Sequence, residues 1–94
     1  MYKIDFKPSV KKDFKNISKA DVSFIRFSLD EFIKNFSSEN EKILMANGKV
    51  KKLQGQKEEL YRLRLRSYRI VYKKYDDRLV ILVVHVTTRE SAYK

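Results

Sequence analysis

The stretch of sequence that decides the fold reads LYRLRLRSYRIVYKK over residues 60–74. Apolar and basic side chains alternate without a break from Leu60 to Arg66, and this period of two is typical of a β-strand with one apolar and one basic face. Ser67 allows a tight turn, and residues 68–74 predict a second strand after it. The stretch therefore predicts a β-hairpin.

A third strand follows this hairpin. Asp76 and Asp77 predict the next turn. Residues 78–86 are nearly all apolar, which is typical of a strand in the middle of a sheet. Because short loops join the three strands, they pair as an antiparallel meander.

One strand and two helices are predicted upstream of the hairpin. Residues 2–7 alternate between apolar and charged side chains and predict a strand. Pro8 suits the first position of a helix, which is predicted over roughly residues 8–16. Ser18 and Asp21 have the spacing of a capping box, so a longer helix begins near residue 19. Its core face is an apolar stripe at intervals of three and four, formed by Val22, Ile25, Leu29, Phe32, Ile33 and Phe36.

These elements define the predicted fold class. Ser38 and Glu41 form a further capping signal, and Asn47-Gly48 would end a short helix that begins at this signal. This third helix is not part of the predicted element order. The element order β-α-α-β-β-β predicts a single α+β domain over residues 1–94, with an antiparallel sheet and the helices packed on one face. The side of the sheet that carries Leu63 and Leu65 is the apolar surface available to the helices.

Composition excludes several classes of protein. The 94 residues contain no cysteine and one histidine, His85, so disulfides, thiolate metal sites and cysteine nucleophiles are excluded and no cofactor or metal is expected. No apolar run approaches the roughly 20 residues that span a bilayer, and residues 1–7 carry charges where a signal peptide needs an apolar stretch. We therefore expect a cytoplasmic protein that has no contact with a membrane.

The charge of the chain is strongly positive and unevenly distributed. The net charge is +10, of which residues 1–48 contribute +2 and residues 49–94 contribute +8. A field of this sign attracts polyanions or an acidic protein partner. The alternative is a generic basic surface that only keeps the protein soluble.

The basic residues of the hairpin predict a surface for phosphate groups. If Leu63 and Leu65 face the helices, Arg62, Arg64 and Arg66 project from the opposite face. The same surface is expected to include Arg69, which follows the turn, and a basic lead-in formed by Lys49, Lys51 and Lys52. Like charges at every second position repel one another unless an anion offsets them, and guanidinium groups bind two oxygens each. The alternative is a solvated face whose charges only prevent aggregation.

Other polar residues have simpler explanations. His85 falls inside the apolar third strand of the meander, where a structural histidine is favoured over a catalytic one. Arg89 and Tyr93 lie beyond the end of that strand and could fold back over the basic face. For a single tyrosine near the end of the chain, a packing role is favoured over a catalytic one.

Several segments resemble the RelE/ParE superfamily of bacterial and archaeal toxins. These are KLQG at residues 52–55, LYRLR at 60–64, YRIVY at 68–72 and VVHVTTR at 83–89 with Tyr93 after it. The resemblance covers the whole chain in length and element order, and its specific part spans residues 49–93. It implies the RelE-like fold and a small toxin neutralised by a cognate acidic antitoxin, with which it could form a hetero-oligomer.

The resemblance implies two different activities for the two branches of the superfamily. RelE-like toxins enter the ribosomal A site and cleave mRNA by attack of the ribose 2′-hydroxyl on the adjacent phosphate. ParE-like toxins instead inhibit DNA gyrase and are not nucleases. We expect the RelE-type endoribonuclease, because Arg69 and the Arg89/Tyr93 pair are retained. The alternatives are a ParE-like gyrase inhibitor or a non-catalytic basic binding module.

The resemblance also implies roles for individual residues. Arg64 and Arg69 would stabilise charge on the phosphate, Arg89 would assist the leaving group, and Tyr93 would stack on or orient the nucleotide. Many relatives carry a histidine where this chain has Thr88. Since an arginine cannot accept a proton at any working pH, the base is expected to be Tyr93, or else a group supplied by ribosomal RNA or the substrate. The lysines 49, 51 and 52, together with Arg62 and Arg66, are expected to bind RNA.

Overall fold

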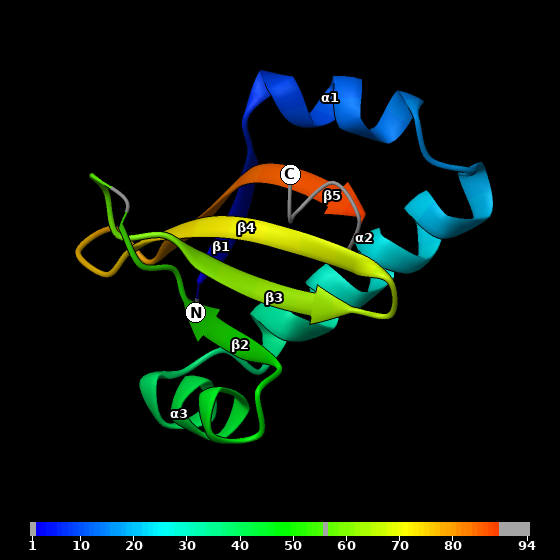
Figure 1. Ribbon diagram of the computed structural model, residues 1–94. Helices are drawn as coiled ribbons and strands as arrows, with labels where there is room; N and C mark the ends of the chain where they lie inside the picture. The colour runs from blue at the N-terminus through cyan, green and yellow to red at the C-terminus, as the bar shows by residue number, and fades with distance from the viewer. Residues whose placement is uncertain (1, 56, 89–94) are drawn as a thin grey trace.

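The computed structural model describes residues 2–55 and 57–88, which form three helices and five strands in a single layered arrangement (Figure 1). Along the chain these are β1 (Lys3–Phe6), α1 (Pro8–Lys15), α2 (Lys19–Lys34), α3 (Ser38–Ala46), β2 (Val50–Lys52), β3 (Tyr61–Leu65), β4 (Tyr68–Tyr75) and β5 (Val80–Thr88). The α+β class and the order of the predicted elements are confirmed. The optional third helix is present as α3, and β2 is an additional short strand.

The five strands form one sheet in the order β1-β5-β4-β3-β2. β3, β4 and β5 make the predicted antiparallel meander, and β2 adds to its outer edge antiparallel to β3. β1, however, pairs with β5 in parallel, from Lys3 opposite Val80 to Phe6 opposite Val83. The sheet is therefore mixed, and the prediction of a purely antiparallel sheet was wrong at this edge.

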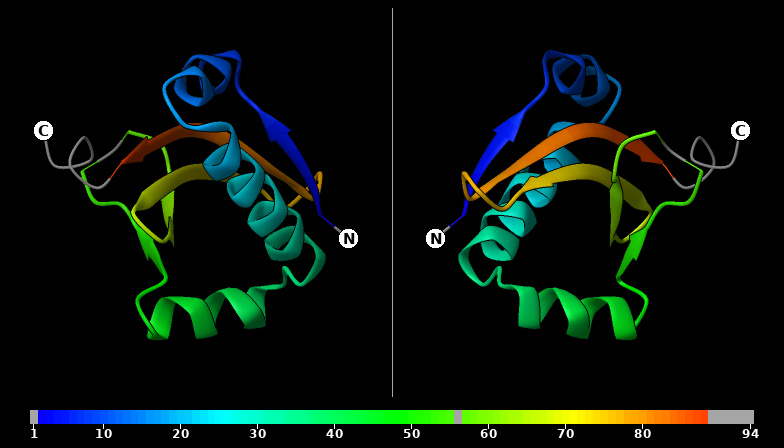
Figure 2. Two further views of the ribbon diagram at one scale, coloured as in Figure 1. Left: turned by 90° about the vertical axis from the view of Figure 1, so that its right-hand side faces the viewer. Right: turned by 90° about the vertical axis from the view of Figure 1, so that its left-hand side faces the viewer.

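The three helices lie at different positions around the sheet. Figures 1 and 2 show α2 lying across one face of the sheet, α1 beside the β5 end, and α3 next to β2. In Figure 2 the sheet curls around α2, so that its β2 edge approaches α3. This curvature leaves the opposite face of β3 and β4 uncovered by any of the three helices.

The core forms between α2 and the sheet, as the apolar stripe predicts. Ile25 and Leu29 of α2 are buried against Leu63 of β3, Ile70 of β4 and Ile81 of β5. Each fully buried aliphatic side chain of this size stabilises the fold by about 1.5–3 kcal/mol relative to exposure. Leu63 and Leu65 therefore face the helices, as expected.

Local capping explains where the longer helices begin. The Ser18 hydroxyl oxygen accepts a hydrogen bond from the Asp21 amide at 3.2 Å, which confirms the predicted start of α2. At α3 the cap is Ser37 rather than Ser38, because the hydroxyl of Ser37 accepts from the Asn40 amide at 3.0 Å. The predicted capping signal was therefore placed one residue too late.

Candidate functional site

The strand register brings two of the predicted arginines together. Arg64 of β3 is the direct cross-strand partner of Arg69 of β4, and Lys51 of β2 is the partner of Arg62 of β3. Since Leu63 and Leu65 face the helices, these four basic side chains belong to the opposite face of the sheet. We call this group, Lys51, Arg62, Arg64 and Arg69, the basic row.

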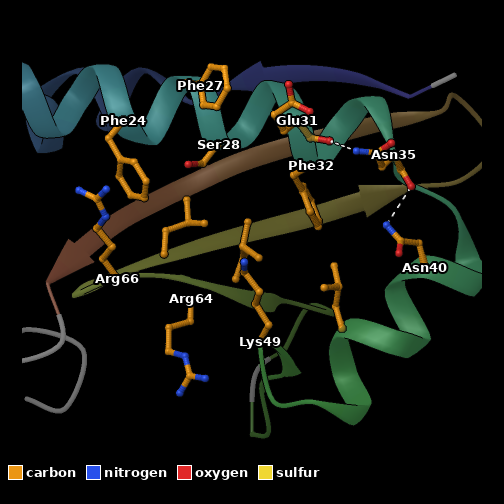
Figure 3. Close-up of a pocket in the computed structure, with 13 residues that line it drawn as sticks. Phe24, Phe27, Ser28, Glu31, Phe32, Asn35, Asn40, Lys49, Arg64 and Arg66 are labelled. Carbon is orange, nitrogen blue, oxygen red and sulfur yellow. Dashed lines mark hydrogen bonds between the residues drawn. The ribbon is translucent and has the colours of Figure 1, made fainter.

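Arg64 and Arg69 differ in their exposure to solvent. Arg64 is exposed, and Figure 3 shows its guanidinium group directed away from α2. Arg69 is only 6% exposed, so its charge is largely withdrawn from water. Two like charges opposite each other in adjacent strands destabilise a sheet unless an opposite charge offsets them. The two guanidinium groups make this pair a candidate contact for a phosphate group.

Arg62 has a structural contact as well as a place in the basic row. Its Nη2 donates a hydrogen bond of 2.8 Å to the carbonyl oxygen of Gly48, which lies in the turn between α3 and β2. Gly48 has a φ of 81°, a conformation that favours glycine. Arg62 thus fixes the position of this turn relative to β3.

Arg66 does not join the basic row, contrary to the sequence prediction. β3 ends at Leu65, and Arg66 occupies the two-residue turn to β4 with a φ of 54°. Its guanidinium carbon lies 3.8 Å from the ring centroid of Phe24 on α2. Figure 3 shows the two side chains next to each other. The turn interrupts the alternation of the strand, so the side chain points to the helix side, where it packs on an aromatic ring.

The three lysines of the predicted lead-in are also divided between the faces. Lys51 joins the basic row through its pairing with Arg62, whereas Lys52 pairs with Tyr61, whose side chain is in the core. The amine of Lys52 lies 3.3 Å from a carboxylate oxygen of Glu59. Only alternate residues of a strand share a face, so the adjacent residues Lys51 and Lys52 lie on opposite sides of the sheet.

A hollow of about 420 Å³ lies on the helix side of the sheet, between α2, α3 and β3 (Figure 3). Its apolar lining includes Phe24, Phe27 and Leu44, and Phe27 is 65% exposed. Lys49 and Arg66 are basic residues of its lining, Arg64 also borders it although its guanidinium group is directed away from α2, and Glu31 is the one acidic residue among its described lining. Lys49 therefore borders an apolar surface with a basic rim.

A second cavity, of about 220 Å³, lies where α1 meets the end of β5 and holds His85. The side chain of His85 is 54% exposed, and its Nδ1 lies 3.1 Å from Oδ2 of Asp13 on α1. His85 is within an apolar strand, as predicted, but its imidazole is on the open side. Nothing in the sequence indicates the partnership with Asp13, because the two residues come from opposite ends of the chain.

Two predicted site residues cannot be placed. Arg89 and Tyr93 lie outside the described residues, and Thr88 is the last described residue of β5. Within residues 2–55 and 57–88 no group of three or more metal-binding side chains occurs. In the same part of the chain no helix is long and apolar enough to cross a membrane.

Solved structures that resemble this fold define the class of protein. The chain shares 26% identity and a TM-score of 0.67 with a chain of the archaeal RelE–RelB complex from Pyrococcus horikoshii OT3, with 94% of each chain covered. It shares 27% identity and a TM-score of 0.66 with the intact E. coli RelBE toxin–antitoxin complex, covering 94% of this chain and 96% of that one. A mutant of E. coli toxin RelE in the free state is similar at 26% identity and a TM-score of 0.67, over 98% of this chain and 87% of that chain. These relatives are toxins or toxin–antitoxin complexes.

A family model gives the narrower assignment. Residues 4–93 match the model of the ParE toxin of type II toxin–antitoxin systems (parDE). The chain therefore belongs to this toxin family, within the RelE/ParE superfamily. A comparison with curated proteins yields no match.

Proposed function

We propose that this toxin is a ribosome-dependent mRNA endonuclease that cleaves by attack of a ribose 2′-hydroxyl on the adjacent phosphate. The observation that carries the proposal is the direct pairing of Arg64 with Arg69 on the sheet face opposite α2. The likeness to RelE structures at 26–27% identity over at least 94% of the chain supports the RelE-like branch.

The basic row would act mainly on the charge of the reacting phosphate. As the 2′-oxygen attacks, negative charge grows on the non-bridging oxygens, and donors already held in place stabilise that charge without reorganising. Arg64 is accessible to RNA, and Arg69 is held in a largely desolvated position where its charge acts more strongly. Lys51 and Arg62 would contact neighbouring phosphates. Arg89 and Tyr93 keep their proposed roles at the leaving group and the nucleotide base.

A pair of arginine variants tests this function. Arg64→Ala is expected to abolish growth arrest and the cleavage of mRNA in ribosomal A sites, because it removes the exposed member of the pair. Primer extension on cellular mRNA after brief expression would show the cuts and their loss. Arg78→Ala is the matched control, since Arg78 carries the same charge but lies in the turn before β5, over the ring of Tyr75. It should cleave as the wild type does.

A ParE-like inhibitor of DNA gyrase is the second candidate, and the family model that matches residues 4–93 favours it. Under this function expression would arrest growth without A-site cuts, and purified toxin would inhibit supercoiling by gyrase. Arrest that survives in Arg64→Ala, together with a DNA-damage response, would replace the endonuclease proposal by this one.

The proposed partner is an acidic antitoxin. The chain has a net charge of +10, and the hollow beside α3 combines apolar side chains with a basic rim formed by Lys49 and Arg66. An amphipathic segment with carboxylates beside its apolar face would match both features. RelE structures in complex with RelB support a partner of this kind. We expect the complex to weaken as salt concentration rises.

A further inference from the structure

The histidine at the end of β5 is held by a carboxylate from the first helix. Nδ1 of His85 lies 3.1 Å from Oδ2 of Asp13, and the same oxygen accepts a hydrogen bond of 3.0 Å from the amide of Val86. The Asp13 side chain is 18% exposed, whereas that of His85 is 54% exposed. One edge of the imidazole is therefore held against α1 while the rest of the ring meets solvent.

This contact determines which ring nitrogen is available. A nitrogen so close to a carboxylate oxygen carries the proton, because two lone pairs would otherwise face each other. In the neutral imidazole the lone pair is then on Nε2, for which the described part of the chain provides no partner. His85 is thus oriented to accept a proton from an external group.

The sheet register places this nitrogen beside the basic row. His85 is the cross-strand partner of Val71, which in turn pairs with Arg62, and Thr87 is the partner of Arg69. His85 and Arg69 are therefore diagonal neighbours on the sheet face opposite α2, at a separation of about 7–8 Å between their backbones. The cavity of about 220 Å³ that holds His85 is also lined by Thr87 and Thr88. A nucleotide whose phosphate contacts Arg69 would bring its ribose near this cavity.

The basic row needs a proton acceptor that it does not contain. Arginine side chains remain protonated at working pH and cannot accept the 2′-hydroxyl proton. We propose that His85 is the general base of the endonuclease and that Asp13 is its positioning residue, an inference that rests on the function proposed above.

The proton of the 2′-hydroxyl moves to Nε2 of His85 as the 2′-oxygen bonds to phosphorus. The bond from phosphorus to the 5′-oxygen breaks, and that oxygen takes a proton from water. The products are a 2′,3′-cyclic phosphate and a 5′-hydroxyl, and the imidazolium later returns its proton to solvent.

Single-turnover cleavage of mRNA by purified toxin on programmed ribosomes tests the inference. His85→Gln is expected to slow cleavage by about 100-fold or more, the range typical of a lost general base. Its affinity for ribosomes, measured by co-sedimentation, should be unchanged. Glu39→Gln is the control, because Glu39 is an exposed residue of α3, which adjoins β2 rather than β5. It should cleave within about twofold of wild type, and circular dichroism of each variant would confirm the fold.

A double variant separates a base from a structural contact. Asp13→Asn is expected to slow cleavage when His85 is present, because Asp13 orients the imidazole. It should have no further effect in His85→Gln, because a positioning residue acts only through the group that it positions. If Asp13 only stabilised the fold, Asp13→Asn would slow both proteins alike.

Two outcomes would count against the inference, and they are distinguishable. If wild type cleaves and His85→Gln cleaves equally fast, His85 is not the base, while the endonuclease function stands. If wild type does not cleave mRNA on ribosomes, the proposed function fails and the role of His85 fails with it.

Discussion

At the scale of single residues, two non-glycine residues of the described chain have a positive φ, a backbone conformation that glycine favours. Arg66 has a φ of 54° and Leu79 a φ of 53°. Arg66 gains a contact with Phe24 at this position. Leu79 is 42% exposed, and its carbonyl oxygen accepts a hydrogen bond from the Lys3 amide at 2.8 Å, which joins the turn before β5 to β1. The strained conformation of Leu79 is therefore held by the pairing of two strands rather than by its own side chain.

The backbone of Leu79 gives a prediction about stability. Leu79→Gly should be about 1 kcal/mol more stable to unfolding than Leu79→Ala, because only glycine adopts this φ without a steric cost from Cβ. The two variants remove the same exposed leucine contacts, so each is the control for the other. Urea unfolding of both proteins measures the difference. Equal free energies of unfolding would show that the turn relaxes to a negative φ.

At the scale of elements, α3 is attached to the sheet by a buried carboxylate. Glu41 is 5% exposed and accepts hydrogen bonds from the Tyr72 hydroxyl at 2.9 Å and from the Lys74 amine at 2.6 Å. Burial alone would lower the pKa of Lys74, but the hydrogen bond and charge of Glu41 more than offset this and raise the pKa. The buried ion pair explains how a short helix with the exposed apolar side chains of Ile43 and Met45 stays in place beside β2.

Removing this carboxylate should destabilise the protein substantially. Glu41→Ala is expected to lower the free energy of unfolding by about 3 kcal/mol, because it leaves the amine of Lys74 in a largely buried position without its counter-ion. Glu39→Ala, in the first turn of the same helix but exposed, should cost less than about 1 kcal/mol. Chemical unfolding of both variants checks the contrast. A small effect of Glu41→Ala would mean that α3 detaches without loss of the core.

At the scale of the whole molecule, tyrosine hydroxyls join distant parts of the chain through carboxylates. The hydroxyl of Tyr2 donates to Asp76 and that of Tyr68 donates to Asp21, each at 2.6 Å. These hydrogen bonds raise the pKa of Tyr2 and of Tyr68, and burial followed by the charge of Glu41 raises the pKa of Tyr72. The folded state therefore holds these protons at a pH where the unfolded chain has lost them.

The stability of the fold should consequently decline in alkaline solution. An unfolded tyrosine loses its proton near pH 10, so stability that is fully present below that pH is lost as pH rises further. Between about pH 10 and 12, Tyr72 alone contributes a slope of about 1.4 kcal/mol per pH unit. Tyr72→Phe should show a correspondingly shallower decline, measured by unfolding at several pH values. Parallel curves for wild type and variant would contradict this account.

Local patterns predicted most of the fold. The start of α2 follows from Ser18 and Asp21, and the meander follows from alternation and short turns, because each depends on neighbouring residues. β2 is only three residues long, too short to show a period. The parallel pairing of β1 with β5 joins the two ends of the described chain, so no local pattern reports it.

The members of the basic row were likewise predicted only in part by the local sequence pattern. Alternation along β3 placed Arg62 and Arg64 on one face, and the short turn brought Arg69 beside them. Arg66 does not belong to the basic row because it lies in the turn after β3, where the chain reverses direction. Lys52 does not belong to it because consecutive strand residues face opposite sides. Alternation applies only where a strand continues, and the end of β3 was not visible in the sequence.

The order of residues alone determined that this protein is a basic α+β domain with arginines on one sheet face, since periodicity, turn length and charge all act between near neighbours. Tertiary structure alone decided the parallel edge strand, the buried attachment of α3 and the contact between Asp13 and His85. Each of these joins residues far apart in the chain, and such contacts form only when the packing of the core brings distant elements together.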